Sequence, residues 1–204
     1  MNLDDVPQPD SSTARAALEV ATAYYSPALV NHCLRSYLWG ASYGIRHDIG
    51  FDAELLFVSA MLHDIGLVKE FDSHTVPFEE AGGHVAWVFG AGAGWPVERR
   101  RRAAEIIVRH MWDEVDADVD PEGHLLGIAT GLDISGRAAG RWPSDFRSEV
   151  VRRIPRLALS EEFLNCFEAQ ARRKPASSAA AAIESGIADR IAANVLDQVF
   201  PGQR

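Results

Sequence analysis

The tetrapeptide His-Asp-Ile-Gly occurs twice in this chain, at residues 47–50 and 63–66, and an adjacent His and Asp can hold one metal ion between them. The first copy lies in a charged stretch without apolar periodicity, so we expect His47 and Asp48 to be exposed or to separate two helices. The second copy ends an almost wholly apolar segment, which is typical of a buried helix. Buried there, His63 and Asp64 need partners, because an unpaired imidazole and carboxylate would cost several kcal/mol.

Two further polar residues lie within apolar helical patterns. His32 is flanked by Val30 and Leu34, and Asp133 follows Leu132. A single buried histidine is more often an ordinary hydrogen-bonded core residue. Four such groups on three helices, in the order His, His-Asp and Asp, favour a metal site over hydrogen bonding within the core, because imidazole and carboxylate suit zinc, iron or manganese.

The segments that carry these residues are all predicted to be helical. Ser12 or Thr13 can cap a first helix, Ser26 with Pro27 can begin a second, and Asp52 can cap a third. No alternating strand pattern, hairpin dipeptide or repeat occurs, so the predicted class is all-α. The helices are expected at about 13–25, 27–43, 53–64, 79–91, 97–112, 122–135, 145–154, 161–173 and 177–199.

Composition predicts one globular domain. The chain has 204 residues and 47% hydrophobic residues, enough for one domain over 1–204 with a core at about 26–136 and C-terminal helices at 145–199 packed on it. Its net charge of −9 disfavours nucleic acid or an anionic membrane as a partner. No apolar run reaches membrane-spanning length, and Cys33 and Cys166 are expected to be buried free thiols, so a cytoplasmic location is predicted.

Five segments together resemble a known family. The segments are NHCLRSYLWG, ELLFVSAMLHDIGL, PFEEAGG, EIIVRH and GIATGLDISG, which span about residues 31–136. They are similar to the HD-domain metalloprotein superfamily, whose signature is H…HD…D, and within it to the cyanamide hydratase-like branch. That branch adds water to the C≡N group of cyanamide to give urea. The resemblance implies an HD-domain helical bundle, here with an additional C-terminal helix.

The resemblance also implies a metal site. Its ligands would be His32, His63, Asp64 and Asp133, holding one divalent ion, for which zinc is the implied metal and iron or manganese are suitable alternatives. Zinc can lower the pKa of a bound water to about 7 and so supply hydroxide at neutral pH.

Four more residues match the branch or its pocket. Glu79 and His110 are candidates for proton transfer, although Glu79 can equally be a favoured acidic residue at a helix start and His110 a hydrogen-bonded core residue. Arg35 either contacts substrate or pairs with a buried acidic residue such as Glu79. Trp112 either walls a small pocket or belongs to the core.

His84 bears on the number of metal ions. Two-metal HD proteins carry extra histidine ligands between the HD pair and the last Asp, and His84 and His110 lie in that interval. However, Phe78 stands where the extra histidine usually precedes the small-residue pair, which here is Gly82-Gly83. We therefore predict one metal ion, and we expect His84 to shape substrate binding if it points into the pocket.

The sequence thus predicts a metal-dependent hydratase or hydrolase of a small nitrile-like molecule, with cyanamide as the lead substrate. The alternatives are an HD phosphohydrolase of a nucleotide or phosphate monoester, a two-iron oxygenase, and a non-catalytic signalling module. Leu67 replaces the Lys often found in phosphohydrolases, and modules without activity usually lose ligands. A homo-oligomer is a further prediction, because the last helix is apolar at Ile187, Ile191, Val195 and Val199.

Overall fold

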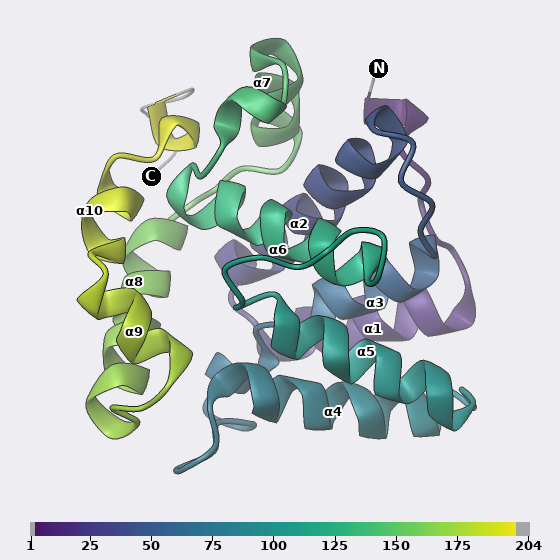
Figure 1. Cartoon of the computed structure of the whole chain (residues 1–204), viewed down its shortest axis with the longest axis horizontal. Coiled ribbons are helices and arrows are strands. Elements are labelled where there is room, and N and C mark those ends of the chain that lie inside the picture. The colour runs from purple at the N-terminus through teal and green to yellow at the C-terminus, as the bar shows by residue number, and fades with distance from the viewer. Residues whose placement is uncertain (1–2, 199–204) are drawn as a thin grey trace.

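Helices form the framework of residues 3–198, the part of the chain that the structure, a computed structural model, describes (Figure 1). No strand occurs in that range, which confirms the all-α prediction. The α-helices are α1 (Ser12–Tyr24), α2 (Pro27–Arg46), α3 (Ala53–Leu62), α4 (Phe78–Gly92), α5 (Val97–Arg109), α6 (Pro121–Ser135), α7 (Ser144–Arg153), α8 (Leu159–Arg173), α9 (Ser178–Glu184) and α10 (Ile187–Ala192). Short 3-10 helices lie at Leu3–Asp5, Ile65–Leu67, Ala139–Arg141 and Val195–Gln198.

Side-chain caps fix where several helices begin. Ser26 accepts a hydrogen bond from Leu29 N ahead of α2, and Asp52 accepts one from Leu55 N ahead of α3, as predicted. α1 begins one residue earlier than predicted, because Ser11 is its cap rather than Ser12 or Thr13.

Helix α3 lies at the centre of the fold. All its residues from Leu55 to Leu62 are buried, and it packs against α1, α2, α4, α5 and α6. A helix buried on every side must be apolar on every side, which is why its sequence shows no polar face. The helix ends at Leu62, so His63 and Asp64 emerge from its C-terminal end inside the protein.

Two helix pairs bring the other site residues to that end of α3. Helices α2 and α6 pack closely, since a Cβ added at Gly40 would lie 3.0 Å from the Leu125 carbonyl oxygen. This pairing brings His32 of α2 within reach of Asp133 of α6. Helices α4 and α5 run side by side below them (Figure 1), and α5 also contacts α3 and α6.

Two departures from the predicted elements concern the first His-Asp-Ile-Gly copy and the last predicted helix. Helix α2 continues past Tyr43 to Arg46, and the first His-Asp-Ile-Gly copy forms the exposed turn after it, with Asp48 at φ 55°. The single helix predicted over 177–199 is divided, because Gly186 adopts φ 79° and separates α9 from α10. Its residue Val199 lies outside the described part of the chain.

The C-terminal helices form one side of the molecule. Helices α8, α9 and α10 contact one another, and α10 also contacts α6 (Figure 1, left). Ile191 is buried within the chain, whereas Val195 is exposed, so only part of the apolar pattern faces outward. Among the helices of residues 3–198, none combines the length and apolar content needed to cross a membrane.

Replacement by alanine should affect stability very differently at the two glycines of the repeated motif. A Cβ at Gly66 would lie 2.1 Å from the Phe78 carbonyl oxygen, whereas a Cβ at Gly50 meets nothing within 4 Å. We expect Gly66→Ala to lower the free energy of unfolding by about 1–3 kcal/mol, because backbone must shift. Gly50→Ala should change it by less than about 0.5 kcal/mol. Thermal denaturation measures both, and equal melting temperatures for the two variants would contradict the close packing.

Candidate metal centre

Three side-chain atoms converge at the end of α3. His32 Nε2 lies 3.1 Å from His63 Nε2 and 3.4 Å from Asp64 Oδ2, and His63 Nε2 lies 3.2 Å from the same oxygen. All three side chains are buried. Ligands at about 2.1 Å from one tetrahedral ion lie about 3.4 Å from each other, so the spacing suits a shared divalent ion.

The outer nitrogens of both histidines fix their tautomers. His32 Nδ1 lies 2.7 Å from Asp133 Oδ2 and His63 Nδ1 lies 2.8 Å from the Ala60 carbonyl oxygen, and each acceptor requires an N–H on the ring. In the neutral rings both Nε2 atoms therefore carry lone pairs. Two such lone pairs and a carboxylate oxygen repel one another unless a cation lies between them.

Asp64 lacks a compensating charge. Its Oδ2 is buried without a hydrogen-bond partner, and within residues 3–198 no Lys or Arg lies within ion-pair distance of it. Burial alone would raise its pKa, but the neighbouring His63 and His32 hold the pKa of Asp64 well below its usual range. An ionised buried carboxylate beside two imidazole lone pairs fits a divalent cation, which would satisfy all three atoms at once.

Asp133 occupies a different position from Asp64. Arg35 donates to both of its oxygens, at 2.9 and 2.8 Å, and Trp39 Nε1 donates to Oδ1 at 2.9 Å. Its Oδ2 also accepts from His32 Nδ1, so the carboxylate lies behind the His32 ring rather than beside the three converging atoms. These contacts favour a role in orienting His32. Coordination by Asp133 as a fourth ligand stays a prediction.

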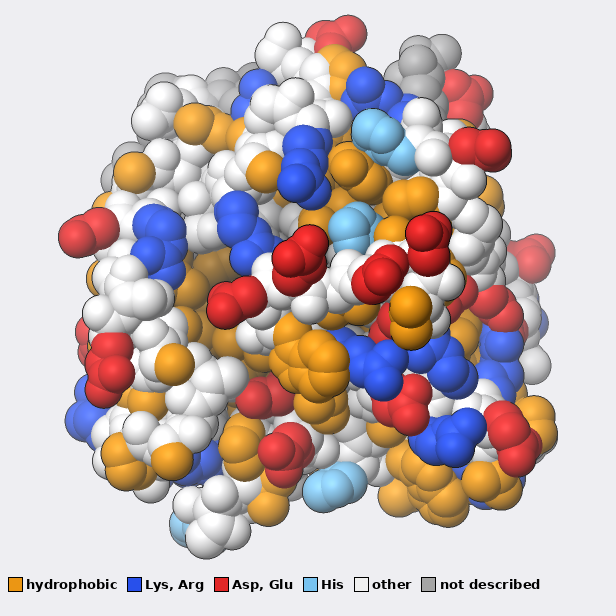
Figure 2. All heavy atoms as spheres, in the orientation of Figure 1, with side chains coloured by type: hydrophobic (Ala, Val, Ile, Leu, Met, Phe, Trp, Pro, Cys, Tyr) orange, Lys and Arg blue, Asp and Glu red, His pale blue; other side chains and the backbone are white. Residues whose placement is uncertain are grey.

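A cavity of about 770 Å³ opens onto the three ligand atoms. One side comes from the α5–α6 region, with His110, Trp112 and Thr130, and the opposite side from α8 and α9, with Phe163, Phe167 and Ser178. Arg137 and Arg190 also line it. Figure 2 shows the hollow between the C-terminal helices and the middle of the molecule, with apolar side chains in its floor and basic ones at its edge.

Comparison with known proteins identifies the family. The HD domain model matches residues 29–135, which contain the three converging residues and Asp133. The chain belongs to the HD-domain family. Cyanamide hydratases DDI2 and DDI3 of Saccharomyces cerevisiae are each 30% identical to it over 176 residues, which cover 83% of this chain and 77% of theirs. HD domains bind divalent metal ions, and this chain is accordingly a metal-dependent enzyme of the hydrolase or hydratase kind.

The HD fold brings two of the other predicted residues into the cavity. His110 is 6% exposed, its Nδ1 donates to the Ile107 carbonyl oxygen, and its ring packs edge-on against His63 with centroids 5.0 Å apart. Burial, and then the neighbouring His63, lowers the pKa of His110 to about 3, so its ring is neutral at pH 7. Trp112 lines the cavity and is 53% exposed, so it forms part of the wall and not of the core.

Three predicted residues lie outside the cavity lining. Arg35 is fully buried and pairs with Asp133, not with Glu79, so it does not reach a ligand in the cavity. His84 is exposed on α4, so the condition for its predicted role in substrate binding is not met. Glu79 is buried and is not a lining residue, although its neighbour Ser178 is.

Several residues that support the centre were not singled out in the sequence. Trp39 Nε1 donates to Asp133 Oδ1, and Arg156 and Asn194 donate to the Asp133 carbonyl oxygen. A buried charge in the apolar segment IPRLAL was a usable signal for Arg156. Trp39 and Asn194 gave none, because their roles depend on which helix packs opposite.

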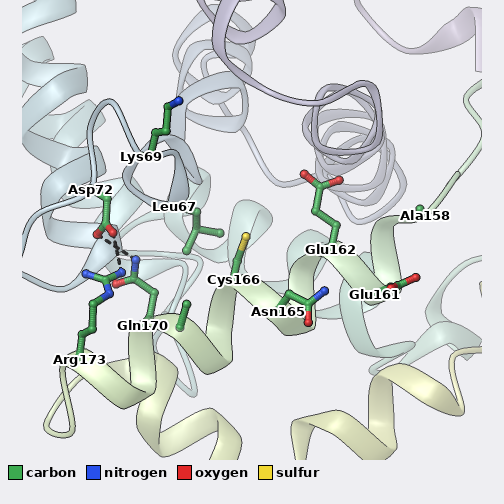
Figure 3. A pocket seen from close by; sticks show the side chains of 11 residues that line it. Leu67, Lys69, Asp72, Ala158, Glu161, Glu162, Asn165, Cys166, Gln170 and Arg173 are labelled. Carbon is green, nitrogen blue, oxygen red and sulfur yellow. Dashed lines mark hydrogen bonds and ion pairs between the residues drawn. The ribbon is translucent and has the colours of Figure 1, made fainter.

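Helix α8 is clamped to the loop that follows the HD pair. Asp72 of that loop accepts from Gln170 at 2.9 Å and pairs with Arg173 at 2.5 Å (Figure 3). The buried Lys174 donates to Asp72 at 2.9 Å as well. All of these clamp residues except Lys174 line a groove together with Cys166, Glu162 and Lys69, whereas Phe163 and Phe167 of α8 line the cavity of the metal centre. The clamp fixes the C-terminal wall of the cavity against the HD domain.

Proposed function

We propose that this enzyme hydrates a small nitrile-like molecule, with cyanamide to urea as the lead reaction. The observation that carries the proposal is the buried carboxylate of Asp64, which has no Lys or Arg partner among residues 3–198 and lies beside two imidazole lone pairs that line a cavity. Similarity to two yeast cyanamide hydratases supports the reaction class. A cytoplasmic location, a small-molecule substrate without a nucleic-acid or membrane partner, and a homo-oligomer are parts of the same proposal.

His32 Nε2, His63 Nε2 and Asp64 Oδ2 would hold one divalent ion, zinc in our proposal. When bound, such an ion lowers the pKa of a coordinated water and supplies an oxygen nucleophile near neutral pH. Asp133 and the Ala60 carbonyl hold the two rings in the tautomers that this requires. His84, exposed on α4, lies outside the cavity lining, which supports one ion over two.

His110 and Glu79 are assigned different proton roles. Neutral His110, with Nδ1 committed to Ile107, presents Nε2 as an acceptor and would orient water or an amino group. Burial raises the pKa of Glu79 above its ordinary value, which favours the protonated form that a proton donor needs. Glu79 is therefore the proposed source of the proton that the nitrile nitrogen receives.

A phosphohydrolase is the second candidate, because Arg137 and Arg190 line the same cavity and guanidinium groups bind phosphate. We expect the zinc-loaded protein to release urea from cyanamide and no phosphate from p-nitrophenyl phosphate or a nucleotide panel. The cavity of about 770 Å³ exceeds what a molecule of three heavy atoms fills, so larger nitriles should be tested beside cyanamide. Phosphate release that is lost in Asp64→Ala, without urea formation, would replace the hydratase proposal.

A further inference from the structure

Glu79 has no direct access to the cavity. It is 7% exposed in the first turn of α4, and it is not among the residues that line the space beside His63 and Asp64. Its Oε2 is buried without a hydrogen-bond partner. A carboxyl group in this position can exchange a proton with a ligand only through another polar group.

Ser178 is the group that lies between them. Its side chain lines the cavity, and its hydroxyl is near enough to the Glu79 carboxyl to lower the pKa that burial raises. Ser178 Oγ, like Glu79 Oε2, is buried without a well-formed hydrogen bond of its own. Buried hydroxyl and carboxyl groups are nearly always satisfied in folded proteins, so two neighbouring groups that are both unsatisfied need an explanation.

Helix capping does not account for the position of Ser178, because the preceding residue, Ser177, caps α9. Ser177 is the cap of α9 and accepts from Ala180 N at 3.3 Å, and it also donates to the Lys174 carbonyl oxygen at 2.7 Å. Ser178 makes no capping bond. The capping of α9 is therefore complete with Ser177, and the Ser178 hydroxyl is left without a structural partner.

We propose that Ser178 is a catalytic residue that delivers the proton from Glu79 to the substrate nitrogen, so that a residue beyond the HD domain match completes the active site. This rests on the proposed function. Water forms the C–O bond and loses one proton while a π bond of C≡N breaks. The nitrogen takes the Ser178 hydroxyl proton, and Ser178 regains one from Glu79. The proton that water loses then returns to Glu79 through Ser178, the group that connects it with the cavity. The product is isourea, which tautomerises to urea.

The test compares the two neighbouring serines in the full-length, metal-loaded protein. Ser178→Ala should lower kcat for urea formation at least about tenfold, with KM and metal content near wild type, since relayed proton transfer contributes about 10²–10⁴. Ser178→Thr keeps a hydroxyl and should restore most of kcat. Ser177→Ala should lower the melting temperature and leave kcat unchanged.

Coupling and titration separate a relay from a packing effect. In one relay, adding Ser178→Ala to Glu79→Gln should cause no further loss of kcat. Ser178→Ala should also raise the pKa of Glu79, because the nearby hydroxyl lowers it. The titration is followed by the ¹³C NMR signal of the Glu79 carboxyl group, which is assigned by its loss in Glu79→Gln. Glu80 and Lys174, which also affect this pKa, stay the same in both proteins.

Additive losses of kcat, or equal losses in Ser177→Ala and Ser178→Ala, would overturn the relay. If the wild-type protein forms no urea, the hydratase proposal fails, and the titration then decides on the pair by itself. An unchanged Glu79 titration in Ser178→Ala would overturn the pairing, whereas a raised pKa would support it.

Discussion

Replacement of His63 or Asp64 by alanine should abolish both metal binding and activity. Each change removes one of the three atoms that converge within 3.1–3.4 Å at the end of α3. Metal analysis should fall from about one equivalent per chain to background. Metal should stabilise the wild-type protein by about 4 kcal/mol at a free concentration near one thousand times Kd, and this gain should vanish in the variants.

The controls come from the same sequence motif. His47→Ala and Asp48→Ala change the exposed copy of His-Asp-Ile-Gly and should keep metal content, activity and metal-dependent melting near wild type. His84→Ala should do the same, because this side chain is exposed on α4. Loss of metal in any of the three controls, or retention of metal in Asp64→Ala, would show that the centre is elsewhere.

The fold was largely predictable because local signals agree with tertiary packing. The apolar run of α3 and the caps at Ser26 and Asp52 gave the correct helices. Gly186 misled the prediction, since a glycine within an alanine-rich helical pattern can continue a helix or, as here at φ 79°, end one. Helical periodicity has no information on that choice.

The site was predictable only at the level of residue type. The order His32, His63-Asp64 and Asp133 selected the buried polar residues that do lie together. Which oxygen of Asp133 contacts which donor depends on how α6 is rotated about its axis relative to α2. Helical periodicity does not determine that rotation. For the same reason nothing in the sequence distinguished Ser177 from Ser178.

The buried carboxylates of Asp133 and Asp64 lie in different electrostatic surroundings. Asp133 is neutralised by Arg35, and its hydrogen bonds with Arg35 and His32 hold its pKa well below the usual range against the effect of burial. Asp64 has only the two imidazoles. Burial opposes protonation of His32, but the hydrogen bond to Asp133 and the nearby Asp64 carboxylate raise its pKa overall, so the surroundings of His32 favour positive charge. A metal ion meets that demand as a proton would.

Asp133→Asn should therefore weaken both the fold and the metal site through the contacts of Asp133 with Arg35 and His32. The amide keeps the shape but leaves the buried Arg35 without its counterion, for which we expect a loss of about 3–5 kcal/mol in unfolding free energy. The amide N–H also opposes the His32 Nδ1–H, so the ring is no longer held with its Nε2 lone pair toward Asp64. Metal affinity should fall about 10–100-fold, the usual effect of losing such a supporting partner.

Asp72→Asn is the matched control for this change. Asp72 also pairs with basic side chains, Arg173 and Lys174, but it contacts neither histidine of the centre. Its variant should lose stability and keep metal affinity, measured by chelator competition on folded protein. Loss of metal in Asp133→Asn as complete as in His63→Ala would instead make Asp133 a direct ligand. In that case the absorption bands of the Co²⁺-substituted protein would shift as well, because the ligand set of the ion would change. An unchanged affinity would mean that the His32 ring is held by its packing alone and that the Asp133 hydrogen bond contributes nothing to metal binding.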